Sequence, residues 1–116
     1  MLNEQLWLQH SNLTKVVIPN RVTIIGERAF KRCFNLTQVV IPDSMTIIRE
    51  EAFADCTSLT SIVISKRITE IGKKAFCSCS NLVSVDLLDS TIKIGEEAFI
   101  GCPGENKLRK KYPHLF

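Results

Sequence analysis

The sequence predicts an α/β solenoid of about four 23-residue coils, with a parallel sheet on one face and short helical turns on the other. The first observation is that three columns of residues return every 23 positions without insertion or deletion. The columns are Leu13, Leu36, Leu59 and Leu82; Phe30, Phe53, Phe76 and Phe99; and Cys33, Cys56, Cys79 and Cys102. The second is that a fixed period of about 20–29 residues is typical of solenoids, in which each repeat is one turn of a superhelix.

Length and charge limit the possible classes of protein. A chain of 116 residues suffices for one small domain. Its formal charge of +3 is mild and predicts no nucleic-acid partner. There is no apolar run of about 18 residues, so we expect no membrane span. The opening MLNEQLWLQHS lacks a basic flank and an unbroken apolar run, so we do not expect it to be a secretory signal.

Residues 1–11 resemble the second half of a repeat. Aligning LNEQLWLQHSN with IGERAFKRCFN places Trp7 on Phe30 and His10 on Cys33. We interpret this segment as an N-terminal half-coil, which is either a divergent cap over the first coil or part of a longer array.

The first half of each coil predicts a strand. In LTQVVIP, the apolar residues Leu36, Val39 and Ile41 alternate with the period of a half-buried strand, and Pro42 ends pairing because it lacks an amide donor. The run MTII then predicts a second short extended segment. The following REEAFADC predicts about two turns of helix, or a tight turn, with one apolar stripe. Stacking the coils gives ladders of Ala, Phe and Cys inside the core.

The repeats resemble the BspA-type, or Treponema pallidum-type, leucine-rich repeat. The pattern LTxVxIPxxVTxIGxxAFxxCxx recurs as NLTKVVIPNRVTIIGERAFKRCF, NLTQVVIPDSMTIIREEAFADCT, SLTSIVISKRITEIGKKAFCSCS and NLVSVDLLDSTIKIGEEAFIGCP. These repeats occupy 12–34, 35–57, 58–80 and 81–103. The resemblance implies a right-handed leucine-rich-repeat solenoid and a role in adhesion or protein recognition, often at the cell surface. It supplies no catalytic residue.

Several positions depart from the family pattern. Arg49 replaces the glycine of the other repeats, so that position does not strictly require a left-handed backbone. Ser65 and Leu88 replace Pro19 and Pro42, while Asp86 enters the valine column of the fourth repeat.

The cysteines and histidines do not form a predicted catalytic or metal site. Cys77 and Cys79 are separated by one residue, which does not match the C-x₂₋₄-C spacing of zinc sites. The column cysteines have parallel side-chain directions, so we expect free thiols that act as small core residues. The chain has no motif for a nucleophile, a metalloprotease or a phosphate-binding loop. We therefore predict no enzyme activity, no metal and no cofactor.

The exposed sheet face is the candidate binding site. On each strand, residues that alternate with the buried positions face solvent. The predicted binding residues are Lys15, Val17, Gln38, Val40, Ser61, Val63, Ser84 and Asp86. An apolar valine stripe on an uncovered parallel sheet favours a protein partner, although strand propensity alone also explains valine there. Sheet-face or end-to-end self-association is a further expectation.

The basic tail, residues 104–116, leaves the repeat pattern. Its apolar residues predict a cap over the last coil, and its Lys and Arg residues leave open a basic arm for an acidic partner. Two functional classes remain: a surface or extracellular recognition module, implied by the resemblance, and an intracellular scaffold or part of a longer array. Free cysteines are compatible with either compartment.

Overall fold

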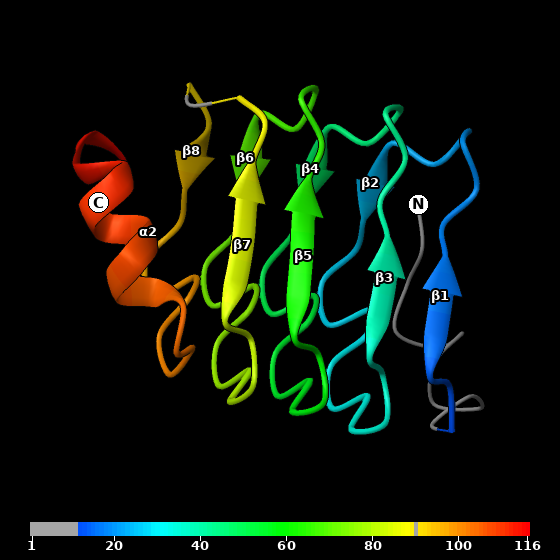
Figure 1. The fold of residues 1–116 in the computed structure, drawn as a ribbon. Helices are drawn as coiled ribbons and strands as arrows, with labels where there is room; N and C mark the ends of the chain where they lie inside the picture. Colours follow the sequence, from blue (N-terminus) through cyan, green and yellow to red (C-terminus); the bar gives the residue numbers. More distant parts are fainter. Residues whose placement is uncertain (1–11, 90) are drawn as a thin grey trace.

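The structure, a computed structural model, describes residues 12–89 and 91–116. Four coils lie side by side, and a helix follows the last of them (Figure 1). The first strands of the coils are β1 (Lys15–Val17), β3 (Gln38–Val40), β5 (Ser61–Ile64) and β7 (Ser84–Leu87). The second strands are β2 (Ile24–Ile25), β4 (Ile47–Ile48), β6 (Glu70–Ile71) and β8 (Lys93–Ile94). These strands pair in parallel and keep the repeat register, so the stacked-coil solenoid is confirmed.

The first strands do not form the single continuous sheet that the sequence predicts. They form two pairs, β1 with β3 and β5 with β7, without a ladder between β3 and β5. The division coincides with the proline column: β1 and β3 have three residues and precede Ile-Pro, whereas β5 and β7 have four. Proline shortens a strand because it removes a donor and restricts the preceding residue. At the junction, the buried Ser65 hydroxyl donates to the Ile41 carbonyl at 3.0 Å.

The second strands form an unbroken sheet on the opposite side of the core. Its order is β2-β4-β6-β8, and it links all four coils (Figure 1). Hydroxyl groups add bonds between the same coils: Thr46 Oγ1 donates to the Thr23 carbonyl at 3.0 Å and Thr69 Oγ1 to that of Thr46 at 3.3 Å. The solenoid therefore has two β-faces.

The segments after the second strands are tight turns, and no helix forms in the described part of the coils. Two positions per coil have positive φ, which interrupts any helix. They are Arg28, Glu51, Lys74 and Glu97 in one column and Arg32, Asp55, Ser78 and Gly101 in the other. The alternate amides that a helix would use internally instead donate to the next coil, as Phe53 N does to the Ala75 carbonyl at 2.7 Å. The tight-turn alternative is thus correct, because bonds between coils replace bonds within a helix.

Three coils have a glycine directly after the second strand, and this glycine permits close approach between coils. The residues are Gly26, Gly72 and Gly95. A Cβ on Gly72 would lie 2.6 Å from Glu50 N, and one on Gly95 would lie 2.5 Å from Lys73 N. Neither glycine has positive φ, so the expectation drawn from Arg49 is correct: the column does not require a left-handed backbone. At Arg49 the amide lies 3.0 Å from the carbonyl of the preceding coil, against 2.7 Å at Gly72, which is consistent with a side chain that holds the coils slightly apart.

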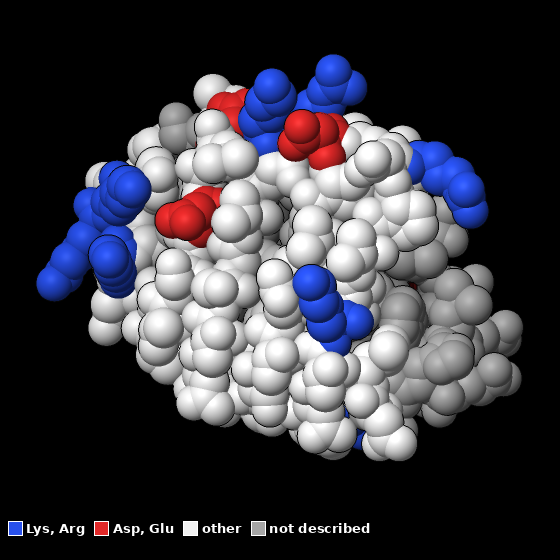
Figure 2. Space-filling view, turned by 45° about the vertical axis from the view of Figure 1, so that its right-hand side comes forward, with Lys and Arg blue, Asp and Glu red and all other residues white. Residues whose placement is uncertain are grey.

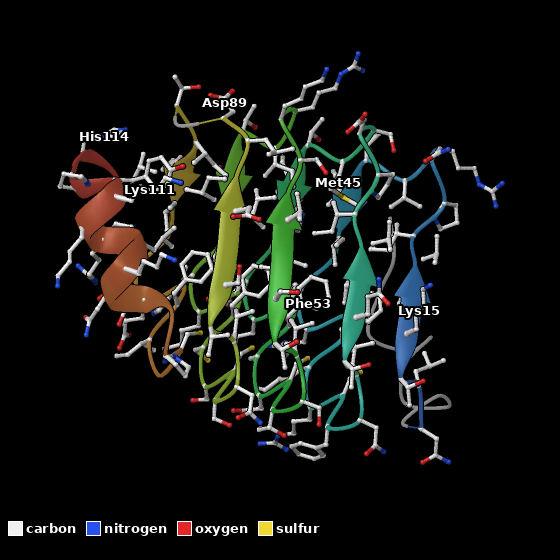
Figure 3. The ribbon with its side chains drawn as sticks, in the orientation of Figure 1. Lys15, Met45, Phe53, Asp89, Lys111 and His114 are labelled. Atoms are coloured by element: carbon white, nitrogen blue, oxygen red, sulfur yellow. The ribbon has the colours of Figure 1, made fainter. Side chains whose placement is uncertain are left out.

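A phenylalanine ladder fills the core. Adjacent rings are nearly parallel, with centroids 4.9 Å apart for Phe30–Phe53, 5.2 Å for Phe53–Phe76 and 5.3 Å for Phe76–Phe99. Phe53 is labelled between the two layers of strands in Figure 3. All four rings are buried, and each is paired by stacking with the equivalent residue one repeat away. The core is therefore continuous through the stack.

The tail covers the front of the last coil. Helix α2 (Glu105–Lys111) is followed by the 3₁₀ turn η1 (Pro113–Leu115). Leu108 is buried in the core cluster, and Tyr112 and Leu115 pack against it. Gly104 permits this approach because a Cβ there would lie 2.8 Å from the Val83 carbonyl oxygen. Among the described residues, no helix has the length and apolar character needed to cross a membrane.

Candidate functional surface

The predicted binding residues lie together on the face formed by the first strands, which we call the front face. All eight are exposed, and they occupy β1, β3, β5 and β7. The parallel register aligns them in rows: Lys15 with Gln38, Val17 with Val40, Ser61 with Ser84, and Val63 with Asp86. Whether they bind a partner stays a prediction.

Three valines form an apolar stripe across the front face. Val17 is 62% exposed, Val40 is 40% exposed and Val63 is 49% exposed. Their neighbours Val39 and Ile62 point into the core and are almost completely buried. Because side chains alternate along a strand, the stripe contributes little to the core and leaves its apolar surface in water. The division between β3 and β5 lies beneath the stripe, between Val40 and Val63.

Charged groups lie mainly around the front face. Figure 2 shows a broad uncharged area with basic side chains at the edge where α2 lies and mixed charges along the upper rim. Lys15 lies on β1 at one end of the stripe, and Asp86 lies on β7 at the other. A partner for this surface therefore needs an apolar centre and polar groups at its ends.

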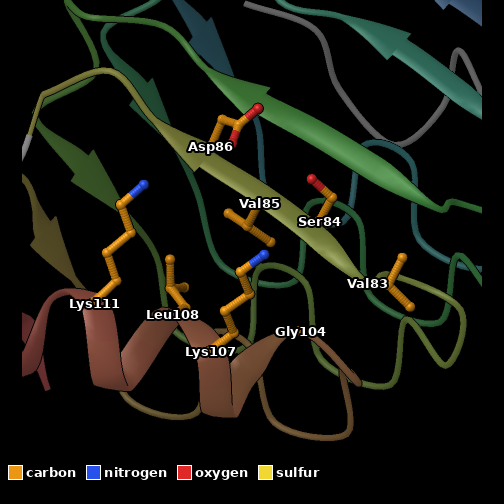
Figure 4. A pocket seen from close by; sticks show the side chains of 8 residues that line it. All are labelled: Val83, Ser84, Val85, Asp86, Gly104, Lys107, Leu108 and Lys111. Carbon is orange, nitrogen blue, oxygen red and sulfur yellow. The ribbon is translucent and has the colours of Figure 1, made fainter.

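Helix α2 adds two residues that the sequence places only in the basic tail. Lys107 and Lys111 extend from one side of α2 toward β7, on either side of Leu108 (Figure 4). With Ser84 and Asp86 they line a shallow pocket of about 70 Å³. Their spacing of four residues is the sequence signal that would place them on one helix face. The pocket admits one side-chain end, not a drug-sized ligand.

The charged residues of the turns join neighbouring coils. Glu51 receives a hydrogen bond from Lys31 and lies 3.6 Å from Arg28, both in the preceding coil. The Lys31 hydrogen bond is the main cause of a lowered pKa of the Glu51 carboxyl, and both positive charges contribute. Arg32 and Asp55 form a second contact of 3.8 Å. These pairs are exposed enough that each contributes little to stability.

The column cysteines are free thiols inside the core. Each of Cys56, Cys79 and Cys102 donates to a phenylalanine carbonyl of the preceding coil, at 3.2, 3.1 and 3.0 Å. Burial is the main cause that raises the pKa of Cys56 to about 12. The hydrogen bond with Cys102 and burial both raise the pKa of Cys79. Cys56 and Cys79 are therefore weak nucleophiles, because the thiolate is the reactive form of cysteine.

Alkylation should distinguish Cys77 from the other four cysteines. Cys77 is half-buried, whereas the other four are buried. With iodoacetamide at neutral pH, we expect at most one rapid modification in the native protein and five after denaturation, counted by mass spectrometry. Rapid native modification of four or five thiols would show that the column is accessible.

The described residues do not assemble a metal site: no group of three or more His, Cys, Asp and Glu side chains lies close enough to hold an ion. His10, which the sequence alignment places in the cysteine column, lies outside the described residues.

Comparison with known families identifies the repeat. The family described as the BspA-type leucine-rich repeat region (6 copies) matches residues 2–109. The chain belongs to the BspA-type leucine-rich-repeat family. The match includes most of the chain and confirms the resemblance carried by the repeats.

Solved structures of leucine-rich-repeat proteins are similar to this BspA-type chain. A protein from Bacteroides ovatus is 39% identical, with a TM-score of 0.75, over 81% of this chain and 24% of its own. The T. pallidum leucine-rich-repeat protein is 37% identical, with a TM-score of 0.74, over 78% of this chain and 42% of its own. A leucine-rich cell surface protein from Faecalibacterium prausnitzii is 34% identical, with a TM-score of 0.69, over 73% of this chain and 22% of its own.

The BspA-type chain thus spans less than half the length of these similar proteins. No curated protein matches it.

Proposed function

We propose that this BspA-type chain is a non-catalytic recognition module that binds a protein partner through the front face. The observation that carries the proposal is the exposed stripe of Val17, Val40 and Val63. Parallel sheets are usually covered on both faces, and an uncovered apolar stripe with polar surroundings is typical of an interaction surface.

The partner that fits is a protein segment with apolar side chains flanked by polar groups. Gln38, Ser61 and Ser84 supply hydrogen-bonding groups beside the valines. Their neutral side chains and the largely uncharged area in Figure 2 favour apolar contact over a highly charged partner. The similar protein described as a leucine-rich cell surface protein supports an adhesion-like role at a surface.

Substituting Val40 tests the front face directly. Val40→Asp places a charge at the middle of the stripe and leaves the buried residues unchanged, since Val40 alternates with Val39. We expect partner affinity to fall at least about tenfold, because an unpaired charge is costly in the centre of an interface. The melting temperature should change little. The measurement is a titration of a purified partner that was isolated only by its retention on the wild-type protein.

Two further variants separate the effect of the new charge from the effect of its position on the molecule. Val40→Thr keeps the β-branched shape and should weaken binding less than Val40→Asp. Glu50→Lys changes charge on the turn side and should leave binding unchanged. If Glu50→Lys abolishes binding and Val40→Asp does not, the turns form the recognition surface and the proposal is wrong.

An intracellular scaffold is the second candidate, and the free thiols are compatible with it. It would use the same face but bind in a reducing compartment. Localisation of the tagged natural protein distinguishes this candidate from a surface adhesin.

A further inference from the structure

The turns of the solenoid contain a repeated row of backbone donors that is left open at the last coil. In the second coil, the amides of Glu51, Phe53 and Asp55 donate to carbonyls of the third at 3.0, 2.7 and 2.9 Å. The same alternate positions donate in the first and third coils. The equivalent donors of the fourth coil are Glu97, Phe99 and Gly101, and none has a backbone acceptor in the described part of the chain.

The open row borders a groove that helix α2 does not fill. The helix lies at the end of the stack, to the side of β7 and β8 (Figure 1), and its residues Lys107, Leu108 and Lys111 line a pocket with residues of β7. A groove of about 360 Å³ lies between the back half and the tail. It is lined by Ile94, Gly95, Glu96, Glu97, Ile100, Glu105, Arg109, Leu115 and Phe116. Ile100 and Phe116 are 44% and 41% exposed, which gives the groove apolar walls.

The charge pattern of the turns indicates which side chains fit the groove. Along one column the charges alternate: Arg28, Glu51, Lys74 and Glu97. Glu51 lies between basic residues of both neighbouring coils, and all of these residues lower the pKa of its carboxyl. Glu97 has a basic neighbour position on one side only, and neither it nor Glu96 forms an ion pair with another described residue. A basic side chain would continue the alternation.

From these observations we propose that the open back half of the fourth coil binds an extended, basic segment of a partner protein. The segment supplies carbonyl groups for the amides of the exposed residues Glu97 and Gly101 and a basic side chain for Glu97. This is a backbone-docking site, separate from the front face, in which main-chain bonds give affinity and side chains give specificity.

The third coil provides the geometry for this mode of binding. The amide of Gly72 donates to the Ile48 carbonyl of the second coil at 2.7 Å. Three carbonyls of the same segment accept hydrogen bonds from the second coil: those of Lys73, Ala75 and Cys77. The corresponding groups of the fourth coil are the Ile94 carbonyl and the open amides. Glycine in the incoming segment permits the close approach, since a Cβ at Gly95 would already lie 2.5 Å from Lys73 N.

Two peptides from this chain form a matched test of charge. The basic peptide has the sequence of residues 70–79 with Cys77→Ser and Cys79→Ser. The acidic control is the same peptide with Lys73→Glu and Lys74→Glu, so that Gly72 is present in both. Both keep the same repeat positions and length, so fluorescence anisotropy of labelled peptides should show at least tenfold tighter binding of the basic one. Equal binding, or no binding of either, would overturn the proposal.

A charge reversal in the protein tests the assigned acidic residue. Glu97→Lys should not strain the backbone, because lysine already adopts a positive φ at the equivalent position of the third coil, where Lys74 has a φ of 55°. We expect the variant to bind the basic peptide at least tenfold more weakly, while Val40→Asp leaves its affinity unchanged. An equal loss with Val40→Asp would place the peptide on the front face and contradict the site.

Hydrogen exchange tests the backbone donors. In the free protein the amides of Glu97 and Gly101 should exchange much faster than those of Glu51 and Asp55, whose hydrogen bonds are internal. Saturation with the basic peptide should slow exchange at Glu97 and Gly101 at least tenfold. Peptide binding without this slowing would show that the open amides are not the docking groups.

Discussion

Phe53→Ala should lower the free energy of unfolding by about 3–5 kcal/mol, the usual cost of emptying a large core site. Phe53 is fully buried, and its ring stacks between Phe30 at 4.9 Å and Phe76 at 5.2 Å. The cavity would thus remove contacts at two coil interfaces. Because repeat stability depends on interfaces between neighbours, we expect the whole described stack to lose cooperativity. Urea melts followed by circular dichroism measure the loss.

Phe34→Ala is the matched control for this prediction. Phe34 is 52% exposed and lies one residue after the cysteine column, so its truncation should change stability by less than about 0.5 kcal/mol. A loss below about 1 kcal/mol for Phe53→Ala would contradict a closely packed ladder.

Alkaline pH should destabilise the fold through the buried thiols. Burial raises the pKa of Cys56 from 9.0 to about 12. Below pH 9 this thiol is neutral in both the folded and the unfolded state, and its contribution to the free energy of unfolding is fully present. Between pH 9 and 12 the unfolded state releases the proton and the folded state retains it, so the free energy of unfolding falls. Cys56 alone should account for about 2–3 kcal/mol between pH 9 and pH 11.

Comparing wild type with Cys56→Ala isolates this contribution from the other groups that titrate at alkaline pH. Urea melts at pH 8, 9, 10 and 11 should show a steeper loss for wild type than for the variant. Parallel losses would mean that the Cys56 thiol ionises equally in the folded and unfolded states.

Much of the candidate surface could be predicted from sequence because the repeat fixes which side chains alternate. Val40 and Val39 are the same residue type, yet their positions relative to Leu36 and Ile41 assign one to solvent and the other to the core. Lys107 and Lys111 could not be added to that surface in the same way. Their place beside Ser84 depends on how α2 packs against the last coil, which Leu108 and Gly104 determine.

The sequence by itself determined the period, the buried ladders and the BspA-type family, because identical residues at a fixed spacing must occupy equivalent places in stacked coils. Only the tertiary structure decided that the turns are not helices, since their amides reach acceptors in the next coil and not in their own segment. It also decided the division between β3 and β5 and the open donor row at Glu97, Phe99 and Gly101. These features depend on whether a neighbouring coil is present and aligned for pairing. The repeat pattern of a coil is the same in either case.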